Sequence, residues 1–435
     1  MTAADPTLAG IETGDDAPRA APEESGPDWR IVGLALALLL GGASYVADAA
    51  SGRQAALYLL GAVLGLVLYH AAFGFASGWR AFVAEGRGAN LRAQMLMLAL
   101  ASAIFLPVLD GGSLFGRGVV GAVAPAGVSV LVGAFLFGIG MQLGGGCASG
   151  TLYTLGGGSG RMVVTLVFFM AGSLLGTANL PWWLSETPKL GAISLLEEWG
   201  LAGALSAQLG AFALIALATV AIERRRHGCL DHGLRGGPCG AGRLGSAGRL
   251  GWRRLLQGPW PLLWGAVLLA LLNVATLGLA GHPWTISFGY TLWGAQAATA
   301  LGVDVASWEF WTWSYPKQAL ADGILGQSTS VMNLGIIAGA FLAAGLAGRF
   351  GPVRNLSWRG ALAAALGGLL MGYGARLAFG CNIGAYFSGI ASGSLHGWLW
   401  LGAALLGTYA GFALRPAFGL AGASAPGPAP LAPRL

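Results

Sequence analysis

Long apolar segments separated by short polar ones run along most of the chain. Each comes close to the roughly 20 residues that a helix needs to cross a hydrocarbon core about 30 Å thick. The segments lie near residues 31–50, 54–77, 93–109, 118–142, 162–181, 199–222, 260–281, 284–303, 328–348, 360–380 and 396–417. Some suit half-spans or re-entrant segments, so we expect about nine to eleven spans in an all-α, polytopic membrane protein. The short alternating segments that are typical of a membrane β-barrel are not seen.

The composition agrees with a bilayer as the solvent of this chain. Of the 435 residues, 55% are hydrophobic and only 10% are charged. Soluble domains carry about 25% charged residues. The mean hydropathy is +0.67.

The polar segments divide the chain into five parts. Residues 1–28 and 419–435 are rich in Ala and Pro, and we expect both to be disordered tails. The first tail is acidic and lacks the basic and apolar regions of a signal peptide. Residues 29–222 and 257–418 hold the spans, and residues 223–256 form a basic loop between them. Short basic loops beside spans stay in the cytoplasm, so we place this loop there.

The basic loop carries much of the net charge of +6. Its basic residues flank spans, so they do not indicate a nucleic-acid partner. Cys229 and Cys239 lie in the loop near His227 and His232. Zinc ligands are usually paired roughly two to four residues apart, whereas these two thiols are ten apart. We therefore expect reduced thiols here, and neither a metal ion nor another cofactor.

Two stretches in opposite halves of the chain share a glycine–cysteine pattern. They read FGIGMQLGGGCASG from residue 137 and LMGYGARLAFGCNIGA from residue 370. An offset of 234 residues superimposes five pairs: Gly138/Gly372, Gly140/Gly374, Gly146/Gly380, Cys147/Cys381 and Gly150/Gly384. The pattern predicts two internal repeats, at about 31–181 and 260–417, joined by one further span and the basic loop.

The orientation of the repeats follows less directly. Simple parity with the basic loop inside puts Arg349, Arg354 and Arg359 outside, against the positive-inside tendency. An inverted second half with a partial span near 284–327 removes this conflict, so we favour inverted repeats.

Glycine has two uses in these repeats. Spaced at four, as in Gly172/Gly176 and Gly407/Gly411, it lets helices approach closely. Clustered, as at 144–146, it breaks the helix, which is tolerated at membrane depth only where the backbone is buried in protein or lines a polar cavity. The helix after a break presents N–H groups and a positive dipole end to an anion. We therefore expect broken or re-entrant helices at the centre of the fold.

The residues at the two breaks are candidates for a substrate pathway. Each cysteine taken alone reads as a small buried hydrophobe, but two at matching repeat positions favour a functional role. A thiol is a weak donor and a polarizable contact, which suits a sulfur-bearing partner. Arg376 is the nearby charged candidate; Gln142 is its neutral counterpart, and capping of a helix end is the alternative role for Arg376. The candidates are Cys147, Gly146, Ser149, Thr151, Cys381, Gly380, Asn382, Arg376 and Gly74.

Two aromatic segments have alternative interpretations. Trp308, Trp311, Trp313 and Tyr315 read either as an interfacial belt or as part of a re-entrant loop. The corresponding first-half segment, HAAFGFASGWRAF at 70–82, contains Gly74 between two phenylalanines. Hydrolytic triads, nucleotide motifs and metal clusters are not visible in the sequence, so we do not expect an enzyme.

Two glycine-rich breaks, GGC and FGC, each followed by a GxxxG span, resemble the YeeE/YedE family of inner-membrane sulfur-transport proteins. The resemblance covers most of residues 54–417. It implies a multi-pass permease of the cell inner membrane that takes up thiosulfate, relayed by hydrogen bonds past Cys147 and Cys381 without covalent transfer. Family members often have a further cysteine between aromatics in the first dipping loop, where this chain has Gly74.

That departure leaves alternatives open. A related sulfur or selenium compound, or another small oxyanion, stays open as the substrate in place of thiosulfate. A membrane thiol protein that relays persulfide sulfur is the other alternative, and it predicts a cytoplasmic sulfurtransferase-type partner at the basic loop.

Overall fold

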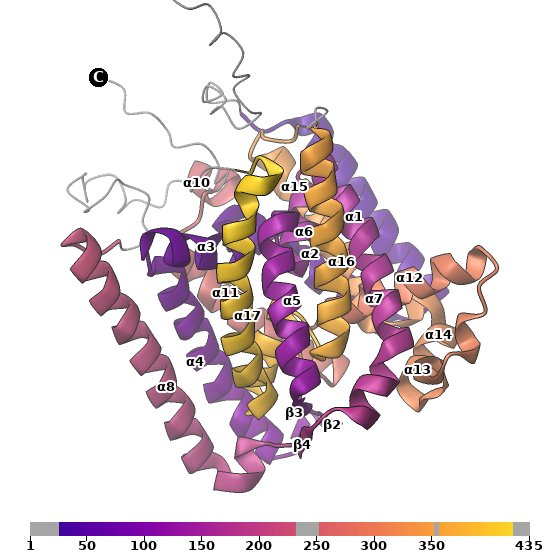
Figure 1. Cartoon of the computed structure of the whole chain (residues 1–435). Coiled ribbons are helices and arrows are strands. Elements are labelled where there is room, and N and C mark those ends of the chain that lie inside the picture. Colours follow the sequence, from indigo (N-terminus) through magenta and orange to yellow (C-terminus); the bar gives the residue numbers. More distant parts are fainter. Residues whose placement is uncertain (1–25, 232–251, 352–355, 421–435) are drawn as a thin grey trace, which may run out of the picture.

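The computed structural model describes residues 26–231, 252–351 and 356–420, and this part of the chain is almost entirely helical (Figure 1). Its longer helices are α1 (Trp29–Ala49), α2 (Gly52–Ala71), α3 (Phe75–Glu85), α4 (Ala89–Asp110), α5 (Val128–Gly144), α6 (Ala148–Gly156), α7 (Gly160–Glu186), α8 (Leu195–His227), α11 (Leu262–Ala280), α12 (Ser287–Ala300), α14 (Ser314–Gly326), α15 (Ser328–Leu346), α16 (Trp358–Leu377) and α17 (Leu395–Leu414). Short helices are α10 (Trp252–Gln257), η1 (Val305–Ser307), α13 (Glu309–Thr312), the π-helix η2 (Asn382–Gly389) and η3 (Arg415–Phe418).

Four short strands form two antiparallel pairs. In β1 (Ser113–Leu114) and β2 (Arg117–Gly118), Ser113 pairs with Gly118. In β3 (Pro125–Gly127) and β4 (Lys189–Ala192), Pro125 pairs with Ala192.

The helices confirm a polytopic membrane protein. Ten helical segments among the described residues are long and apolar enough to span a membrane, which agrees with the expected number. The segment 284–303 is not one of them. Its helix α12 has 14 residues and rises only about 21 Å, so it is too short for a full span, which agrees with the partial span expected near 284–327. Its apolar run is broken before the helix, where Asn273 of α11 accepts the backbone N–H of Trp284 at 2.8 Å.

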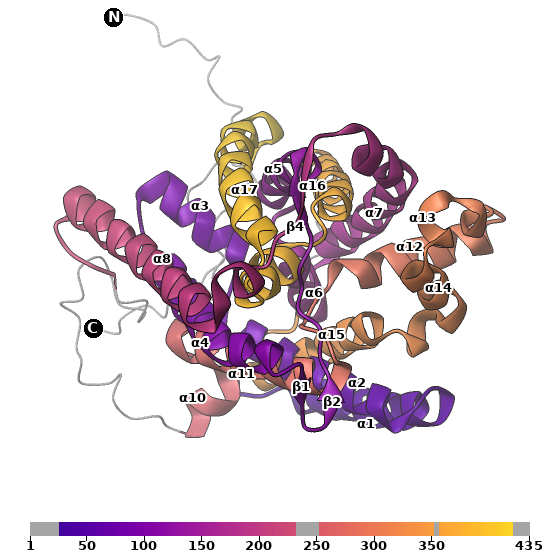
Figure 2. The same cartoon turned by 90° about the horizontal axis from the view of Figure 1, so that it is seen from below.

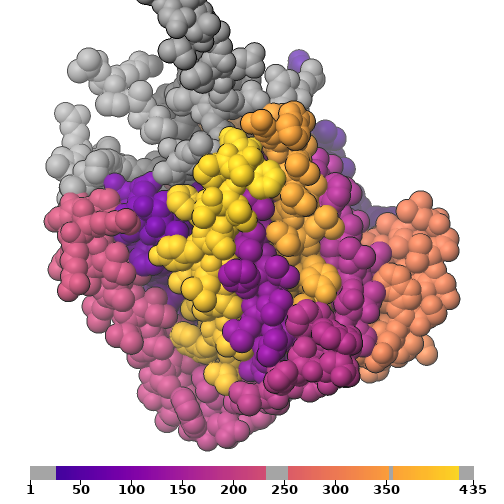
Figure 3. Space-filling view, in the orientation of Figure 1, coloured from indigo at the N-terminus to yellow at the C-terminus, as the bar shows by residue number. Residues whose placement is uncertain are grey.

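The bundle has two distinct ends. Strands β2 to β4 lie at one end, which we call the strand end, and α10 lies toward the other, which we call the loop end (Figures 1 and 2). The segment from α12 to α14, which we call the side arm, stands out from the bundle beside α7 (Figures 2 and 3). The predicted tails lie outside the described residues except at 26–28 and 419–420.

Arg349 and Arg359 lie at the loop end, where α15 ends and α16 begins (Figure 1). Arg349 interacts electrostatically with His70, whose carbonyl oxygen accepts the N–H of Trp260 just after α10. Simple parity, which put these arginines on the side opposite the basic loop, is therefore wrong. Because α12 does not cross, the second half has one span fewer than parity assumed. Arg354 lies outside the described residues.

Glycines bring helices of the two halves into direct contact. A Cβ atom at Gly172 of α7 would overlap the carbonyl oxygen of Leu369 in α16, and one at Gly407 of α17 would overlap that of Phe135 in α5. A Cβ at Gly411 would lie 2.8 Å from Ile139. The expected close-packing role of both GxxxG pairs is confirmed.

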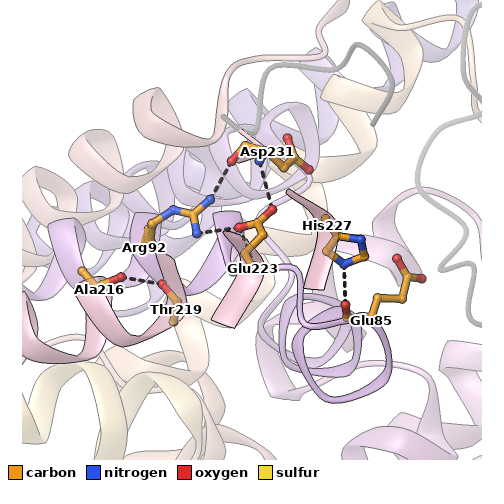
Figure 4. A network of polar contacts seen from close by, with 8 residues as sticks. Glu85, Arg92, Ala216, Thr219, Glu223, His227 and Asp231 are labelled. Carbon is orange, nitrogen blue, oxygen red and sulfur yellow. Dashed lines mark hydrogen bonds and ion pairs between the residues drawn. The ribbon is translucent and has the colours of Figure 1, made fainter. Parts of the chain in front are cut away.

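A buried ion pair ties α8 to the start of α4 (Figure 4). The Glu223 carboxylate accepts from Arg92 Nη1 at 2.7 Å and from the N–H groups of Gly88 and Asp231 at 3.2 and 2.9 Å. Its side chain is fully buried, whereas that of Arg92 is 20% exposed. His227 also contacts the carbonyl oxygen of Glu85 at 2.6 Å. The base of the basic loop is thus fixed to the α3–α4 turn.

Replacing Glu223 should destabilise the protein. The Glu223→Gln variant leaves Arg92 without its carboxylate, and we expect the free energy of unfolding to fall by about 3 kcal/mol. Thermal unfolding of the purified protein measures this. Glu85→Gln is the matched control, because the Glu85–Arg87 pair is partly exposed on both sides and should contribute less than about 1 kcal/mol. Equal melting of the two variants would contradict the assignment.

Cys229 lies just beyond this network and is disulfide-bonded. The expectation of a reduced thiol is therefore wrong for Cys229. Cys239 and His232 lie outside the described residues. Cys147 and Cys381 are free and buried.

Candidate functional site

The first glycine–cysteine stretch breaks a helix as predicted. Helix α5 ends at Gly144, and Gly145 turns the chain with a φ of 85°, a left-handed conformation that favours glycine. Cys147 is then the N-cap of α6. The break therefore sets the thiol at the start of a new helix inside the protein, where Cys147 is 1% exposed.

The Cys147 sulfur occupies the position that a capping oxygen usually takes. It accepts the N–H of Gly150 at 3.4 Å and lies 3.2 Å from Ser149 Oγ. Thr151 Oγ1 donates to the Cys147 carbonyl oxygen at 2.9 Å. A Cβ at Gly146 would meet the backbone of Gly150 at 3.4 Å, so packing does not force glycine there. The thiol thus lies at the positive end of α6 and accepts the Gly150 N–H, one of the amides that were expected to face an anion.

The second stretch makes a corresponding break with different local structure. Helix α16 ends at Leu377, and Phe379 and Gly380 have φ values of 56° and 158°. Cys381 then caps the π-helix η2, and it is fully buried. The Trp400 Nε1–H donates to the Gly380 carbonyl oxygen at 3.2 Å, which holds the break in place. π-helical turns are rare and frequently mark functional sites.

Asn382 follows this cysteine and has an unusual environment. It is fully buried, and neither its Oδ1 nor its Nδ2 has a hydrogen-bond partner. An unsatisfied buried polar group costs about 1–3 kcal/mol, so such groups call for an explanation. A polar ligand that passes beside Cys381 would supply one.

Helix α12 brings the two breaks together. Tyr290 Oη donates to the Ala148 carbonyl oxygen at 2.9 Å and interacts electrostatically with both Cys147 and Cys381. The N–H of Ser287, at the start of α12, hydrogen-bonds the Cys381 sulfur, as do those of η2. The starts of α6, η2 and α12 therefore converge on one buried centre.

Gly74 lies at another helix start, between the buried Phe73 and Phe75. A Cβ at Gly74 would overlap Ser77 Oγ and lie 3.5 Å from Tyr153 Oη. Ser77 Oγ donates to the Gly74 carbonyl oxygen at 3.2 Å. Tyr153 belongs to α6, the helix that Cys147 caps, and interacts electrostatically with Cys147. The hydroxyl groups of Ser77 and Tyr153 thus lie beside Gly74.

Arg376 lies in the last turn of α16, five residues before Cys381. Its Cζ is 5.7 Å from the ring centroid of Phe288 in α12 and 5.3 Å from that of Phe310 in α13. Gln142, its counterpart in the first half, is buried in α5 and donates from Nε2 to the Ala76 carbonyl oxygen of α3 at 3.3 Å. Arg376 therefore contacts α12 and α13, and Gln142 contacts α3, so each residue lies against a short helix.

The tryptophan-rich segment is only partly exposed. Trp311 is 1% exposed, and its Nε1–H donates to Thr177 Oγ1 of α7 at 3.3 Å. Trp311 therefore packs inside the protein and is not part of an interfacial belt, while Tyr315 is 54% exposed.

Reasoning from the sequence missed Tyr290, Ser287 and Asn333. Asn333 Nδ2 donates to the Ile286 carbonyl oxygen at 2.9 Å, and its Oδ1 has no partner. The only signal in the sequence was a few polar residues inside apolar segments. Within the described residues, no group of three or more His, Cys, Asp or Glu side chains could hold a metal ion.

Comparison with known proteins gives a consistent family. A family model described as sulphur transport matches residues 70–410. The chain is 31% identical over 161 residues to the probable transporter YedE of Escherichia coli (strain K12), which is 37% of this chain and 39% of that protein. It thus spans about two fifths of the length of this relative.

Two thiosulfate transporters are matched over more of their length. Identity to TsuA of Spirochaeta thermophila is 28% over 294 residues, which cover 62% of this chain and 73% of that protein. Identity to TsuA of Escherichia coli (strain K12) is 24% over 359 residues, or 81% and 91% of the two chains.

Proposed function

Since the chain belongs to the sulphur transport family, we propose that it is an inner-membrane permease for a small sulfur-containing anion, with thiosulfate as the substrate. The observation that carries the proposal is the meeting of Cys147 and Cys381 at one buried centre, beside the unpartnered amide of Asn382. Two relatives named as thiosulfate transporters support the substrate.

The proposed mechanism is a relay of hydrogen bonds. Each thiol donates its S–H to the anion, and the soft sulfur suits the terminal sulfur of thiosulfate. Asn382 Nδ2 adds a stronger donor, and the amides at the starts of η2 and α12 hold the Cys381 sulfur. Weak donors at several successive positions favour passage, because the ion must bind well enough to enter and weakly enough to leave. No bond to sulfur is made or broken.

A further step of the relay uses oxygen in place of sulfur. Ser77 and Tyr153 present hydroxyls beside Gly74, and Tyr153 lies on the helix that Cys147 caps. We propose that these hydroxyls pass the anion on toward the loop end, which faces the cytoplasm because it carries the basic residues at the end of α8 together with Arg349 and Arg359.

We also propose that the two halves are inverted repeats. In this arrangement α5, α6 and α7 of the first half correspond to α16, η2 and α17 of the second half. The contact of α7 with α16 then corresponds to the contact of α17 with α5, and both contacts occur. Gly133 meets residues 374–378, whereas Gly140 and Gly144 meet residues 367–371, so α5 and α16 run antiparallel. Antiparallel counterparts are what an inverted repeat requires.

Uptake of sulfur-35-labelled thiosulfate into liposomes that contain the purified protein tests the proposal. We expect uptake well above that of empty liposomes, and competition by excess unlabelled thiosulfate. Absent uptake would remove thiosulfate, and competition by selenium compounds or other oxyanions would then identify the alternative. A persulfide on Cys147 or Cys381 after turnover, found by mass spectrometry, would favour the sulfur-relay alternative and its cytoplasmic partner.

A further inference from the structure

Arg376 is a charged side chain placed between two aromatic rings. Only 9% of the residue is exposed. The guanidinium lies over Phe288 from α12 and over Phe310 from α13, so two elements of the side arm enclose it. A cation is attracted to the faces of such rings and tolerates the loss of water there better than elsewhere. The rings hold the guanidinium without using its N–H groups.

These N–H groups have no partner inside the protein. Both Nε and Nη1 are buried and make no hydrogen bond. Arg376 is in neither of the ion pairs Arg87–Glu85 and Arg92–Glu223. A buried charge without a counter-charge is strongly destabilising. Retaining one in a membrane protein points to function, because such residues usually face a substrate or ion pathway.

Tyr315 connects this guanidinium with the surface. Its ring centroid is 5.0 Å from that of Phe288, and the hydroxyl interacts electrostatically with Arg376. The hydroxyl oxygen accepts from Gln327 Nε2 at 2.6 Å, so its own hydrogen can be donated to an anion. Tyr315 is 54% exposed, and thus reaches from the outside of the side arm to Arg376.

The position of Arg376 relative to the cysteines is also specific. Phe288 covers Arg376, and the preceding residue, Ser287, donates its N–H to Cys381. A Cβ at Gly176, in the part of α7 nearer the strand end, would lie 2.6 Å from the Arg376 Cβ. The guanidinium therefore lies beside the start of α12, whose Ser287 contacts Cys381, and Arg376 packs against the part of α7 nearer the strand end.

The other side of the centre is neutral at the matching position. Gln142 contacts the start of α3 as Arg376 contacts the start of α12. Its Oε1 has no partner, but it offers an amide where the second half offers a full positive charge. Arg415 Nη1 donates to the Gln142 carbonyl oxygen at 2.9 Å and Arg161 Nη2 to that of Leu143 at 2.7 Å, so the asymmetry concerns the two matching side chains alone.

We propose that Arg376, held between Phe288 and Phe310, is a separate capture site for small oxyanions and thio-oxyanions ahead of the cysteines. This inference rests on the proposed function for its direction of transport. The planar fork of Arg376 presents two N–H groups to two oxygens of one anion, a geometry that lysine cannot reproduce. The site selects by charge and oxyanion shape, and the thiols then select for sulfur.

Binding to the purified full-length protein tests the site. Calorimetry with thiosulfate and with sulfate as probes should give saturable binding in the wild type. Arg376→Met keeps the length of the side chain and should lower both affinities at least about tenfold; Arg376→Lys should fall between. Arg359→Met is the matched control, since Arg359 lies on the same helix over Trp358, with its Cζ 5.4 Å from the ring centroid, but is exposed. It should bind as the wild type does.

A second readout separates binding from folding. Because Arg376→Met removes an uncompensated buried charge, it should melt at or above the wild-type temperature while it loses anion binding. A purely structural arginine predicts the opposite. If Arg376→Met cannot be purified, Arg376→Lys tests the proposal, and an anion affinity below that of the wild type supports it. Wild-type affinity in either variant overturns the proposal.

The cysteines distinguish this site from the proposed transport function. A Cys147→Ala/Cys381→Ala double variant should still bind thiosulfate and sulfate but should not transport. Equal loss of binding in this variant and in Arg376→Met would overturn a separate site. If the wild type takes up no thiosulfate but still binds anions through Arg376, the proposed substrate fails and the capture site stands.

Discussion

Liposomes that carry the Cys147→Ala or the Cys381→Ala variant should take up thiosulfate at least about tenfold more slowly than the wild type. A hydrogen bond to a charged group contributes about 1.5–3 kcal/mol, and 1.4 kcal/mol corresponds to about a factor of ten in rate. Each substitution removes one donor at the buried centre where the starts of α6, η2 and α12 meet. Initial rates of sulfur-35 uptake, normalised to inserted protein, measure the effect.

The two cysteines need different controls, because Cys147 also caps α6. Alanine there leaves the N–H of Gly150 unsatisfied, and loss of an N-cap costs about 1 kcal/mol. The Cys147→Ser variant keeps a capping atom, so it should regain most of the thermal stability while uptake stays low. Uptake at the wild-type rate in folded Cys147→Ala and Cys381→Ala proteins would disprove the relay and leave a permease of another mechanism.

The helix breaks could be predicted from the sequence because their causes are local. Three consecutive glycines at 144–146 favour a helix break, and the repeat offset of 234 residues carries the same expectation to Gly380 and Cys381. The GxxxG pairs were predictable for the same reason, since Gly172 and Gly407 leave room for another helix whichever helix that is. Composition alone then indicated the membrane.

The rest of the site depends on segments far apart in the chain. Tyr290 reaches Ala148, 142 residues away, and this distance in sequence carries no local signal. Helix α12 reads as part of a span because its neighbours are apolar, and only Asn273 of α11, which accepts the N–H of Trp284, shows where the chain turns. The tryptophans of the side arm likewise read as an interfacial belt until Trp311 is found packed against α7.

The replacement of Gly407 by alanine should be among the most damaging single changes in the protein. A Cβ there would overlap the carbonyl oxygen of Phe135, and backbone cannot rotate away as a side chain can. Helices α5 and α17 would have to separate along their contact. Overpacking of a core typically costs about 1–3 kcal/mol, and we expect the upper end of that range or more. Thermal unfolding in detergent should show a markedly lower melting temperature for Gly407→Ala, and Gly407→Leu should not fold.

Gly402 provides the control on the same helix. It is exposed, and a Cβ there would meet nothing within 4 Å. Alanine favours a helix interior over glycine by about 1 kcal/mol, so Gly402→Ala should melt at or slightly above the wild-type temperature and transport normally. Because α5 carries the break that positions Cys147, Gly407→Ala should lose uptake together with stability. Equal behaviour of the two alanine variants would mean that the α5–α17 contact does not hold the pathway together.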